Sequence, residues 1–171
     1  SIIVTDGNNC SVYDTIILSQ PLALSSSISI TSAISCYGGS DGSLSVQINN
    51  GVSPINYLWS NGSSTQTINN LSVGQYNVTV TDSNNCSLTD NITLNQPSEL
   101  INDSSTTLVS NVSCFGGNTG SIDISPNGGT PPYYFNWSNG ASTEDISNLS
   151  SGNYSVIITD SAGCSSISYS Y

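Results

Sequence analysis

The chain has 171 residues and a formal net charge of −11, because it contains 11 Asp and Glu but no Lys, Arg or His. This composition excludes catalysis by an imidazole or an amine, so Ser-His-Asp and Cys-His pairs, Schiff-base lysines and a P-loop lysine are all absent. It also argues against nucleic acid and anionic lipid as partners, because Lys and Arg are needed to neutralise phosphates.

The distribution of hydrophobic residues favours a folded β protein. They make up 36% of the chain and occur in short runs rich in Val, Ile, Leu and Tyr, unlike a disordered acidic tail. No run approaches the roughly 18 apolar residues of a membrane-spanning helix, so we expect no direct membrane insertion. The chain opens in mid-pattern on "SIIVTD", which we interpret as a segment cut from a longer protein.

An internal repeat with an offset of 78 residues organises the chain. Residues 36–86 match residues 114–164 at about half of the positions, and residues 2–21 match residues 78–97. We therefore expect three parts: residues 1–20 are the C-terminal strands of a preceding repeat, 21–97 are one repeat, and 98–171 are a second. Gln-Pro ends the first two parts, and Pro stops strand pairing and stiffens the junction, which predicts an extended rod.

In chain order, the predicted elements are strands. Apolar residues alternate with polar ones at residues 2–4, 44–48, 55–59 and 76–80, and again in the second copy. Turn sequences separate them: "GGSDG", "NNGVSP", "SNG", "NNLSVG" and "DSNN". Six or seven short strands in about 78 residues predict an all-β fold, with each repeat an antiparallel β-sandwich of immunoglobulin-like type.

The aromatic residues of each repeat have structural interpretations. Trp59 and Trp137 lie on the consistently apolar face of their strands, so we expect them in the core, although an exposed sugar-stacking Trp is the alternative. "NLSVGQYNV" and "NLSSGNYSV" resemble the tyrosine corner of such sandwiches, so Tyr76 and Tyr154 should bond to the backbone near the turn. Asn61-Gly62 and Asn139-Gly140 predict hairpin turns with positive φ.

The five cysteines indicate an oxidising, extracytoplasmic setting. The pairing that we favour lies within each repeat, as Cys36–Cys86 and Cys114–Cys164, and leaves Cys10 with a partner outside this segment. The alternative is an interdomain bridge between Cys36 and Cys164, because the cysteines of one sandwich should lie at its opposite ends. A zinc site is not expected, because the chain lacks His and CxxC spacing.

Acidic residues offer weak candidates for a site. Asp6, Asp82 and Asp160 each end a strand before a cysteine, where they form either a calcium loop or a turn that bonds its own backbone. We favour the turn and expect no cofactor, with calcium as the alternative. No pair of carboxylates converges for acid–base work, so we expect no enzyme.

The pattern Cys-x-Gly-Gly…Pro-x-x-Tyr/Phe-x-Trp-Ser-Asn-Gly…Leu-x-x-Gly-x-Tyr…Thr-Asp…Cys occurs in both copies and closely resembles the SprB repeat of Bacteroidetes surface proteins. The resemblance implies a gliding-motility or adhesin filament that is exported by type IX secretion to the outer cell surface. It also implies O-glycosylation at Thr15 and Ser161, which lie in Asp-Ser/Thr-apolar triplets.

The functional hypothesis at this point is a structural stalk whose partners are neighbouring repeats of the same chain. Like chains in a filament are further partners if the segment self-assembles into a surface fibre. The rival is a carbohydrate-binding module, in which Tyr134 and Asn136 on the outer sheet face hold a surface polysaccharide.

Overall fold

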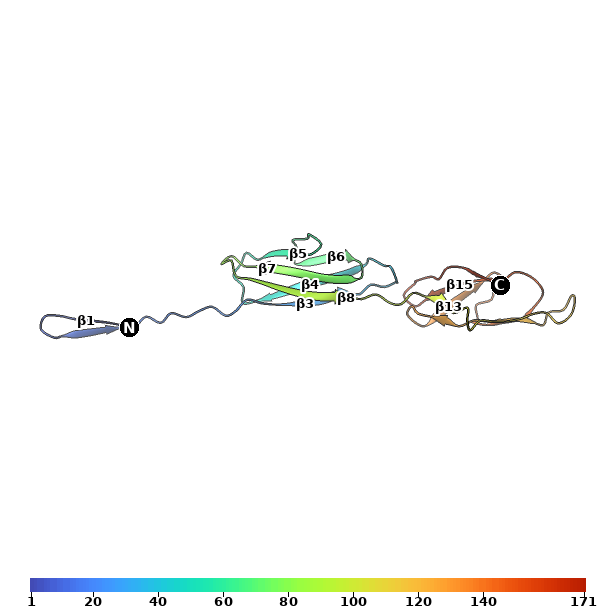
Figure 1. The fold of residues 1–171 in the computed structure, drawn as a ribbon, viewed down its shortest axis with the longest axis horizontal. Helices are drawn as coiled ribbons and strands as arrows, with labels where there is room; N and C mark the ends of the chain where they lie inside the picture. The colour runs from blue at the N-terminus through green and yellow to red at the C-terminus, as the bar shows by residue number, and fades with distance from the viewer.

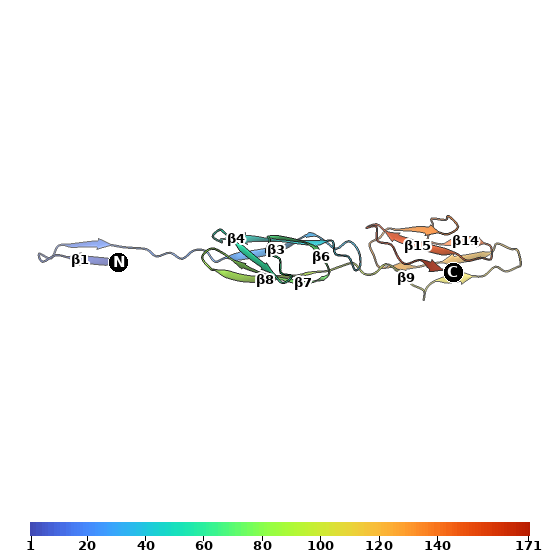
Figure 2. The same cartoon turned by 90° about the horizontal axis from the view of Figure 1, so that it is seen from above.

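The computed structural model describes all 171 residues, which form strands and loops without a helix. A hairpin comes first, followed by two sandwiches that we call domain 1 and domain 2; the three lie one after another along the long axis (Figure 1). Figure 2 shows the same order from above. The structure therefore has no helix with the length and apolarity to cross a bilayer.

The hairpin consists of β1 (Ile2–Thr5) and β2 (Ser11–Asp14), which pair with each other and with no other strand. Domain 1 contains six strands: β3 (Ser25–Ser32), β4 (Gly42–Asn49), β5 (Asn56–Trp59), β6 (Thr67–Leu71), β7 (Gly74–Thr81) and β8 (Ser87–Leu94). Domain 2 contains β9 (Ile101–Asn102), β10 (Leu108–Ser110), β11 (Gly120–Asp123), β12 (Pro126–Asn127), β13 (Tyr133–Trp137), β14 (Ile146–Leu149), β15 (Ser155–Asp160) and β16 (Tyr169–Ser170).

Two three-stranded antiparallel sheets make up domain 1, with strand orders β3-β4-β6 and β5-β7-β8. The third, fifth and sixth strands thus share one sheet and the first, second and fourth share the other, which is the division of an immunoglobulin-like sandwich that lacks one edge strand. Alternate residues of both sheets fill the space between them, as the period of two requires. The predicted all-β, immunoglobulin-like fold is confirmed.

The cores of the two domains are separate and use equivalent positions. Nine buried residues form the core of domain 1: Ile34, Leu44, Val46, Trp59, Ile68, Leu71, Val78, Val80 and Leu94. Eight form the core of domain 2: Leu100, Ile122, Ile124, Trp137, Ile146, Leu149, Val156 and Ile158. Because no core residue is shared, each sandwich has its own hydrophobic core.

Both tryptophans lie inside these cores, each with 2% of its surface exposed. The indole N–H of Trp59 donates to the carbonyl of Thr65 at 2.9 Å, and that of Trp137 donates to the carbonyl of Thr143 at the same distance. Burial therefore leaves neither indole N–H without a partner. The residues just before the tryptophans, Leu58 and Asn136, lie on the exposed outer face.

The Ser-Asn-Gly turn after each tryptophan does more than close a hairpin. Within the Ser60-Asn61-Gly62 turn of domain 1, only Gly62 has a positive φ, of 86°. The chain then crosses from the sheet of β5 to the opposite sheet, where β6 pairs with β4. The prediction of a hairpin at Asn61-Gly62 is therefore wrong in one respect: the chain turns there, but the next strand, β6, does not pair with β5. Trp59 remains linked to the crossing segment through its bond to Thr65.

Domain 2 departs from domain 1 in its first strand. The counterpart of β3 is divided into β9 and β10 by a turn at residues 103–107, in which Asp103 accepts from the backbone N–H of Ser105 at 2.9 Å. These hydrogen bonds, above all from the side chain and backbone of Ser105, lower the pKa of Asp103. The sequence "DSSTT" consists of residues that bond their own backbone, and it therefore favours a turn where domain 1 has alternating Ser and Ile.

Candidate functional site at the joint between the domains

A disulfide bond between Cys36 and Cys164 links the two domains. The Cα atoms of the two cysteines are 5.6 Å apart, and the residues are separated by 128 positions in the sequence. Cys36 lies in the loop between β3 and β4, and Cys164 lies in the loop after β15. The bridge therefore joins the far end of domain 1 to the near end of domain 2.

The favoured pairing within each repeat, Cys36–Cys86 and Cys114–Cys164, does not occur in the structure. Cys36 lies just before β4 and Cys86 follows β7, at opposite ends of the sandwich, because β4 runs between those ends for eight residues, or ~26 Å. A disulfide requires Cα atoms within about 7 Å of each other. Head-to-tail stacking instead brings Cys36 next to Cys164, so the bridge is the interdomain alternative.

A tight turn presents Cys36. The backbone N–H of Gly39 donates to the carbonyl of Cys36 at 2.9 Å, and Gly38 between them has a φ of 71°. Asp41 closes the loop by accepting from the backbone N–H of Ser35 at 3.1 Å. Hydrogen bonding by the side chain and backbone of Ser35 lowers the pKa of Asp41, so the carboxylate stays ionised in this role.

An aspartate organises the loop that presents Cys164. One carboxylate oxygen of Asp160, Oδ1, accepts from the backbone N–H groups of Ala162 at 3.0 Å and of Cys164 at 2.8 Å. The other oxygen, Oδ2, accepts from the backbone N–H of Thr130 at 2.8 Å. With 2% of its surface exposed, Asp160 is a buried turn residue that fixes the direction of Cys164.

The other two calcium candidates occupy the same kind of turn. Asp82 accepts from the N–H groups of Asn84 and Cys86, both at 2.9 Å, and Asp6 accepts from those of Asn8 and Cys10 at the same distance. Asp82 also accepts from the N–H of Val52 at 3.2 Å. Each of these carboxylates is therefore engaged by backbone donors.

The pKa of Asp82 reflects this environment. Burial raises the pKa, but the hydrogen bonds from Cys86, Val52 and Asn84 outweigh burial and lower the pKa below its ordinary value of 3.8. No group of three or more Cys, Asp or Glu side chains converges in a way that could hold a metal ion. The aspartates thus act on the loop backbone.

The linker adds a second contact at the joint. The backbone N–H of Gly38 donates to the side-chain carbonyl of Gln96 at 2.9 Å. Between the two domain ends lies a groove of about 490 Å³, whose lining includes Tyr37, Pro97 and Ile101. The sequence predicts that Gln-Pro is a strand terminator and a stiff junction, but it does not predict the hydrogen bond between Gln96 and Gly38. The recurrence of Gln before Pro at Gln20-Pro21 was the signal that could have indicated a role for this side chain.

The remaining cysteines are exposed free thiols: Cys10, Cys86 and Cys114. Cys86 takes the place in domain 1 that Cys164 takes in domain 2, and Cys114 takes the place of Cys36. Consequently each domain carries one free thiol at the end that faces away from the joint.

The predicted tyrosine corners are present as hydrogen bonds. The hydroxyl of Tyr76 donates to the carbonyl of Ser72 at 3.0 Å, and that of Tyr154 donates to Ser150 at 3.1 Å. Both rings are half-buried against the cores. They hold the loop before β7 in domain 1 and the loop before β15 in domain 2.

The two glycosylation candidates differ in access. Thr15 is exposed in the segment between the hairpin and domain 1. Ser161 is also exposed, but its hydroxyl donates to the carbonyls of Thr130 at 2.7 Å and Pro131 at 3.1 Å. A glycan on Ser161 would break both hydrogen bonds.

The outer sheet face of domain 2 carries the residues considered for polysaccharide binding. Tyr134 is 60% exposed, and Asn136 is exposed beside it on β13. The corresponding residues of domain 1 are Asn56 and Leu58, of which Leu58 is 61% exposed. The face is therefore open in both domains, but only domain 2 presents an aromatic ring there.

The family model of the SprB repeat matches residues 28–64 and 106–142. Each of the two sandwiches therefore holds one match to the SprB repeat. The first match begins within β3 and the second begins in the turn between β9 and β10; each ends just after the Trp-Ser-Asn-Gly turn. The SprB resemblance of the sequence is confirmed, and the two matched stretches lie in domains 1 and 2.

The solved structures to which the chain is similar share little sequence with it. The C-terminal 282-residue fragment of intimin, in complex with the translocated intimin receptor intimin-binding domain, has 10% identity and a TM-score of 0.44. That alignment covers 88% of this chain and 64% of the intimin fragment, so the chain spans less than two thirds of that fragment.

Two further structures cover more of their own length. Fibronectin(III)-like modules of CbhA from Clostridium thermocellum have 16% identity and a TM-score of 0.30, with 84% of this chain and 91% of theirs covered. The amphioxus IgVJ-C2 molecule has 15% identity and a TM-score of 0.33, with 90% and 97% covered. No curated protein matches the chain.

Proposed function

We propose that this chain is a structural stalk segment of a long secreted bacterial surface adhesin that resembles gliding-motility adhesins. The observation that carries the proposal is the covalent joint: two SprB repeats are connected by a short linker and also by the Cys36–Cys164 bridge. Two covalent connections across one joint restrict bending far more than the linker alone, because the bridge fixes a second point on each domain.

The chemistry of the surface supports an extracellular position for this stalk. The chain carries a disulfide bond between Cys36 and Cys164, and such bonds are stable mainly outside the cytoplasm. With a net charge of −11 and no basic side chain, neighbouring stalks repel one another at short range and stay dispersed. Export by type IX secretion and display on the outer surface are part of this proposal, as is a non-enzymatic role.

Small-angle scattering of the 171-residue chain tests the stalk. A compact chain of this length has a radius of gyration of about 16 Å, and we expect a value well above that with the profile of a rod. The matched variant is Cys36→Ser. Its distribution of interatomic distances should broaden, because the joint can bend once the bridge is removed. A radius near 16 Å for the unmodified chain would refute the stalk.

Polysaccharide binding is the second candidate, because Tyr134 exposes an aromatic ring on an open sheet face. Glycan arrays and pull-down on cellulose, chitin and agar separate the two functions. Retention that disappears in Tyr134→Ser, with Leu58→Ser of domain 1 as the matched control, would favour the binding module. No retention leaves the stalk as the function.

A further inference from the structure

Glycine follows asparagine at four places in the chain, and the local geometry of these pairs differs. The asparagines are Asn50, Asn61, Asn127 and Asn139. In such a pair the backbone nitrogen of the glycine can attack the side-chain amide carbon of the asparagine, because glycine has no Cβ atom to obstruct a close approach. The position of each asparagine side chain therefore decides which pair reacts.

Three of the four asparagine side chains are held by hydrogen bonds to other parts of the backbone. Oδ1 of Asn61 and Oδ1 of Asn139 each accept, at 3.1 Å, from the backbone N–H two residues further along the chain. The side chain of Asn50 donates to the carbonyl of Ala23 at 3.2 Å. Each of these hydrogen bonds must break before the amide carbon reaches the nitrogen of the following glycine.

Asn127 is the exception. Its Oδ1 accepts from the N–H of Gly128, the next residue, at 2.8 Å. Because Cγ is one bond of about 1.2 Å from Oδ1, it lies within about 4 Å of that nitrogen. The torsion about the Cβ–Cγ bond is soft, so a rotation there turns the face of the amide carbon toward the nitrogen, as a reactive conformation requires. Asn127 is also exposed, so water reaches it.

Packing at the joint explains why glycine follows Asn127. A Cβ atom built on Gly128 would lie 1.9 Å from the backbone carbonyl oxygen of Glu99, in the segment before β9. Gly128 also has a φ of 79°. The counterpart of this pair in domain 1 is Asn49-Asn50, which has no glycine in second place. The close approach of domain 2 to the linker thus requires an Asn-Gly pair at a position where domain 1 has none.

The loop after Asn127 connects the linker with the cysteine loop of domain 2. The N–H of Gly129 donates to the carbonyl of Ser98 in the linker at 3.0 Å. A Cβ atom built on Gly129 would lie 2.7 Å from Oδ2 of Asp160, the residue that orients the loop of Cys164. A change in backbone length at residue 127 therefore displaces contacts on both sides of this loop.

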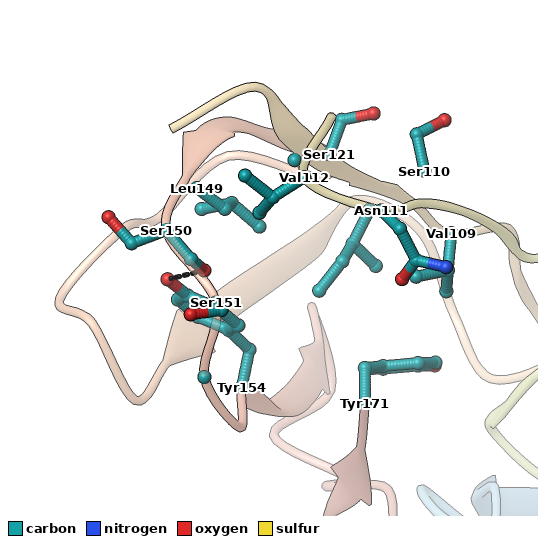
Figure 3. A pocket seen from close by; sticks show the side chains of 13 residues that line it. Val109, Ser110, Asn111, Val112, Ser121, Leu149, Ser150, Ser151, Tyr154 and Tyr171 are labelled. Carbon is teal, nitrogen blue, oxygen red and sulfur yellow. Dashed lines mark hydrogen bonds between the residues drawn. The ribbon is translucent and has the colours of Figure 1, made fainter. Parts of the chain in front are cut away.

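The strand that pairs with β12 is firmly held. It is β9, whose Asn102 is 4% exposed. The side-chain amide of Asn102 donates to the hydroxyls of Thr107 at 2.9 Å and of Tyr171 at 2.6 Å, and Tyr171 is one of the residues that line the pocket in Figure 3. Oδ1 of Asn102 accepts from the N–H of Ser125 at 3.0 Å. A change at residue 127 consequently moves the contacts at the joint more easily than it moves the sheet.

We propose that Asn127 is a self-modification site, at which the chain converts asparagine to isoaspartate and aspartate and thereby loosens the joint with age. The product adds a carboxylate to the loop that contacts Glu99 and Asp160, and the chain has no Lys, Arg or His to balance the charge. Isoaspartate also routes the backbone through the side chain, which lengthens it beside the close approach of Gly128 to the linker. The bridge between the domains is not altered, so they stay connected while their contact weakens.

The reaction consumes only water. A solvent base removes the proton from the backbone nitrogen of Gly128, which attacks Cγ of Asn127 and closes a succinimide ring; the bond from Cγ to the side-chain nitrogen breaks, and ammonia leaves with a proton from solvent. Water then adds to one of the ring carbonyls. Opening on the Cγ side produces aspartate, and opening on the side of the backbone carbonyl produces isoaspartate. No oxidant or reductant takes part.

Ageing of the purified chain in mildly alkaline buffer tests the site. The readout is peptide mapping by mass spectrometry after chymotrypsin, because the chain has no Lys or Arg for trypsin. We expect residue 127 to convert about 5-fold faster than Asn61 and Asn139, since breaking one ordinary hydrogen bond first slows a reaction by about that factor. Asn127→Gln is the matched variant, because its longer side chain would have to close a larger ring, and residue 127 should then stay unmodified.

A second arm measures the joint. Hydrogen exchange at the N–H of Gly129 reports its bond to Ser98 and should become about 5-fold faster in the aged chain, as expected for the loss of one hydrogen bond. In aged Asn127→Gln the exchange should not change. Asn127→Asp should also accelerate it through the added charge, and Asn49→Asp, the same change at the equivalent position of domain 1, should leave it unchanged.

The outcomes separate the site from its effect. Conversion of Asn61 or Asn139 as fast as that of Asn127 would overturn the site, and so would a residue 127 that stays unmodified after prolonged ageing. Conversion of residue 127 without faster exchange at Gly129 would overturn the loosening of the joint. Neither readout depends on whether the chain serves as a stalk.

Discussion

Replacement of Cys36 with serine removes the only bridge of the chain and leaves both cores intact, so it measures what the joint contributes to stability. The bridge spans 128 positions. A crosslink over that length lowers the conformational entropy of the unfolded chain, which raises the free energy of unfolding by ~5 kcal/mol in the loop-entropy treatment. When one domain unfolds while the other stays folded, the constrained loop is about half as long and the same treatment yields ~4 kcal/mol.

Native bridges typically contribute about 2–4 kcal/mol, and we expect Cys36→Ser to lose this amount in each domain. For a domain of this size, a change of 1 kcal/mol in the free energy of unfolding shifts the melting temperature by about 4–8 °C. The melting temperature of each domain should therefore fall by at least about 8 °C in Cys36→Ser. Differential scanning calorimetry without reductant measures the shift. Cys164→Ser should reproduce it, and the double variant should add nothing, because both changes remove one interaction.

Cys10→Ser serves as the control, since Cys10 lies in the separate hairpin and should leave both transitions in place. A Cys36→Ser chain that melts within about 2 °C of the unmodified chain would refute the reasoning. So would a double variant whose loss is the sum of the two single losses, because the cysteines would then stabilise their loops independently.

Three further predictions concern the loops. Tyr76→Phe should lower the free energy of unfolding by about 1 kcal/mol in urea, because it removes the 3.0 Å hydrogen bond to Ser72, while Tyr134→Phe on the open face should have no effect. Asp82 has a lowered pKa, so it binds a proton more weakly in the folded state than in the unfolded state. The stability that it contributes is therefore present above about pH 3.8 and is lost as the pH falls below that value. The melting temperature of Asp82→Asn should depend less on pH in that range. In glycoprotein recovered from the cell surface, peptide mapping should find sugar on Thr15 and none on Ser161, whose hydroxyl is already engaged; the reverse occupancy would contradict this.

Much of the fold could be predicted from local pattern. A period of two assigns each strand one apolar face, and this is sufficient to distinguish the side of Trp59 from the side of Leu58. The short signal "Leu-x-x-Gly-x-Tyr" is likewise complete within six residues, because the hydroxyl of Tyr76 bonds to a carbonyl only four positions earlier. Such features depend on neighbours in sequence and need no knowledge of the whole domain.

The turn after Trp59 shows where local pattern stops. "SNG" predicts a reversal and a positive φ at glycine, and Gly62 has one. It does not say which sheet receives the next strand. That choice depends on whether the edge of β4 or the free edge of β5 accepts it, and only the complete arrangement of six strands determines that β6 pairs with β4.

The sequence by itself determined the repeat, the strand faces, the resemblance to the SprB repeat and the set of cysteines, because each follows from the order and spacing of residue types. Only the tertiary structure decided which cysteines meet. Cys36 and Cys86 belong to one repeat, but a strand of eight residues holds their loops apart, whereas the linker brings Cys36 within bonding distance of Cys164 across the joint. Disulfide partners are set by distance in space, and that distance follows from how the two sandwiches stack.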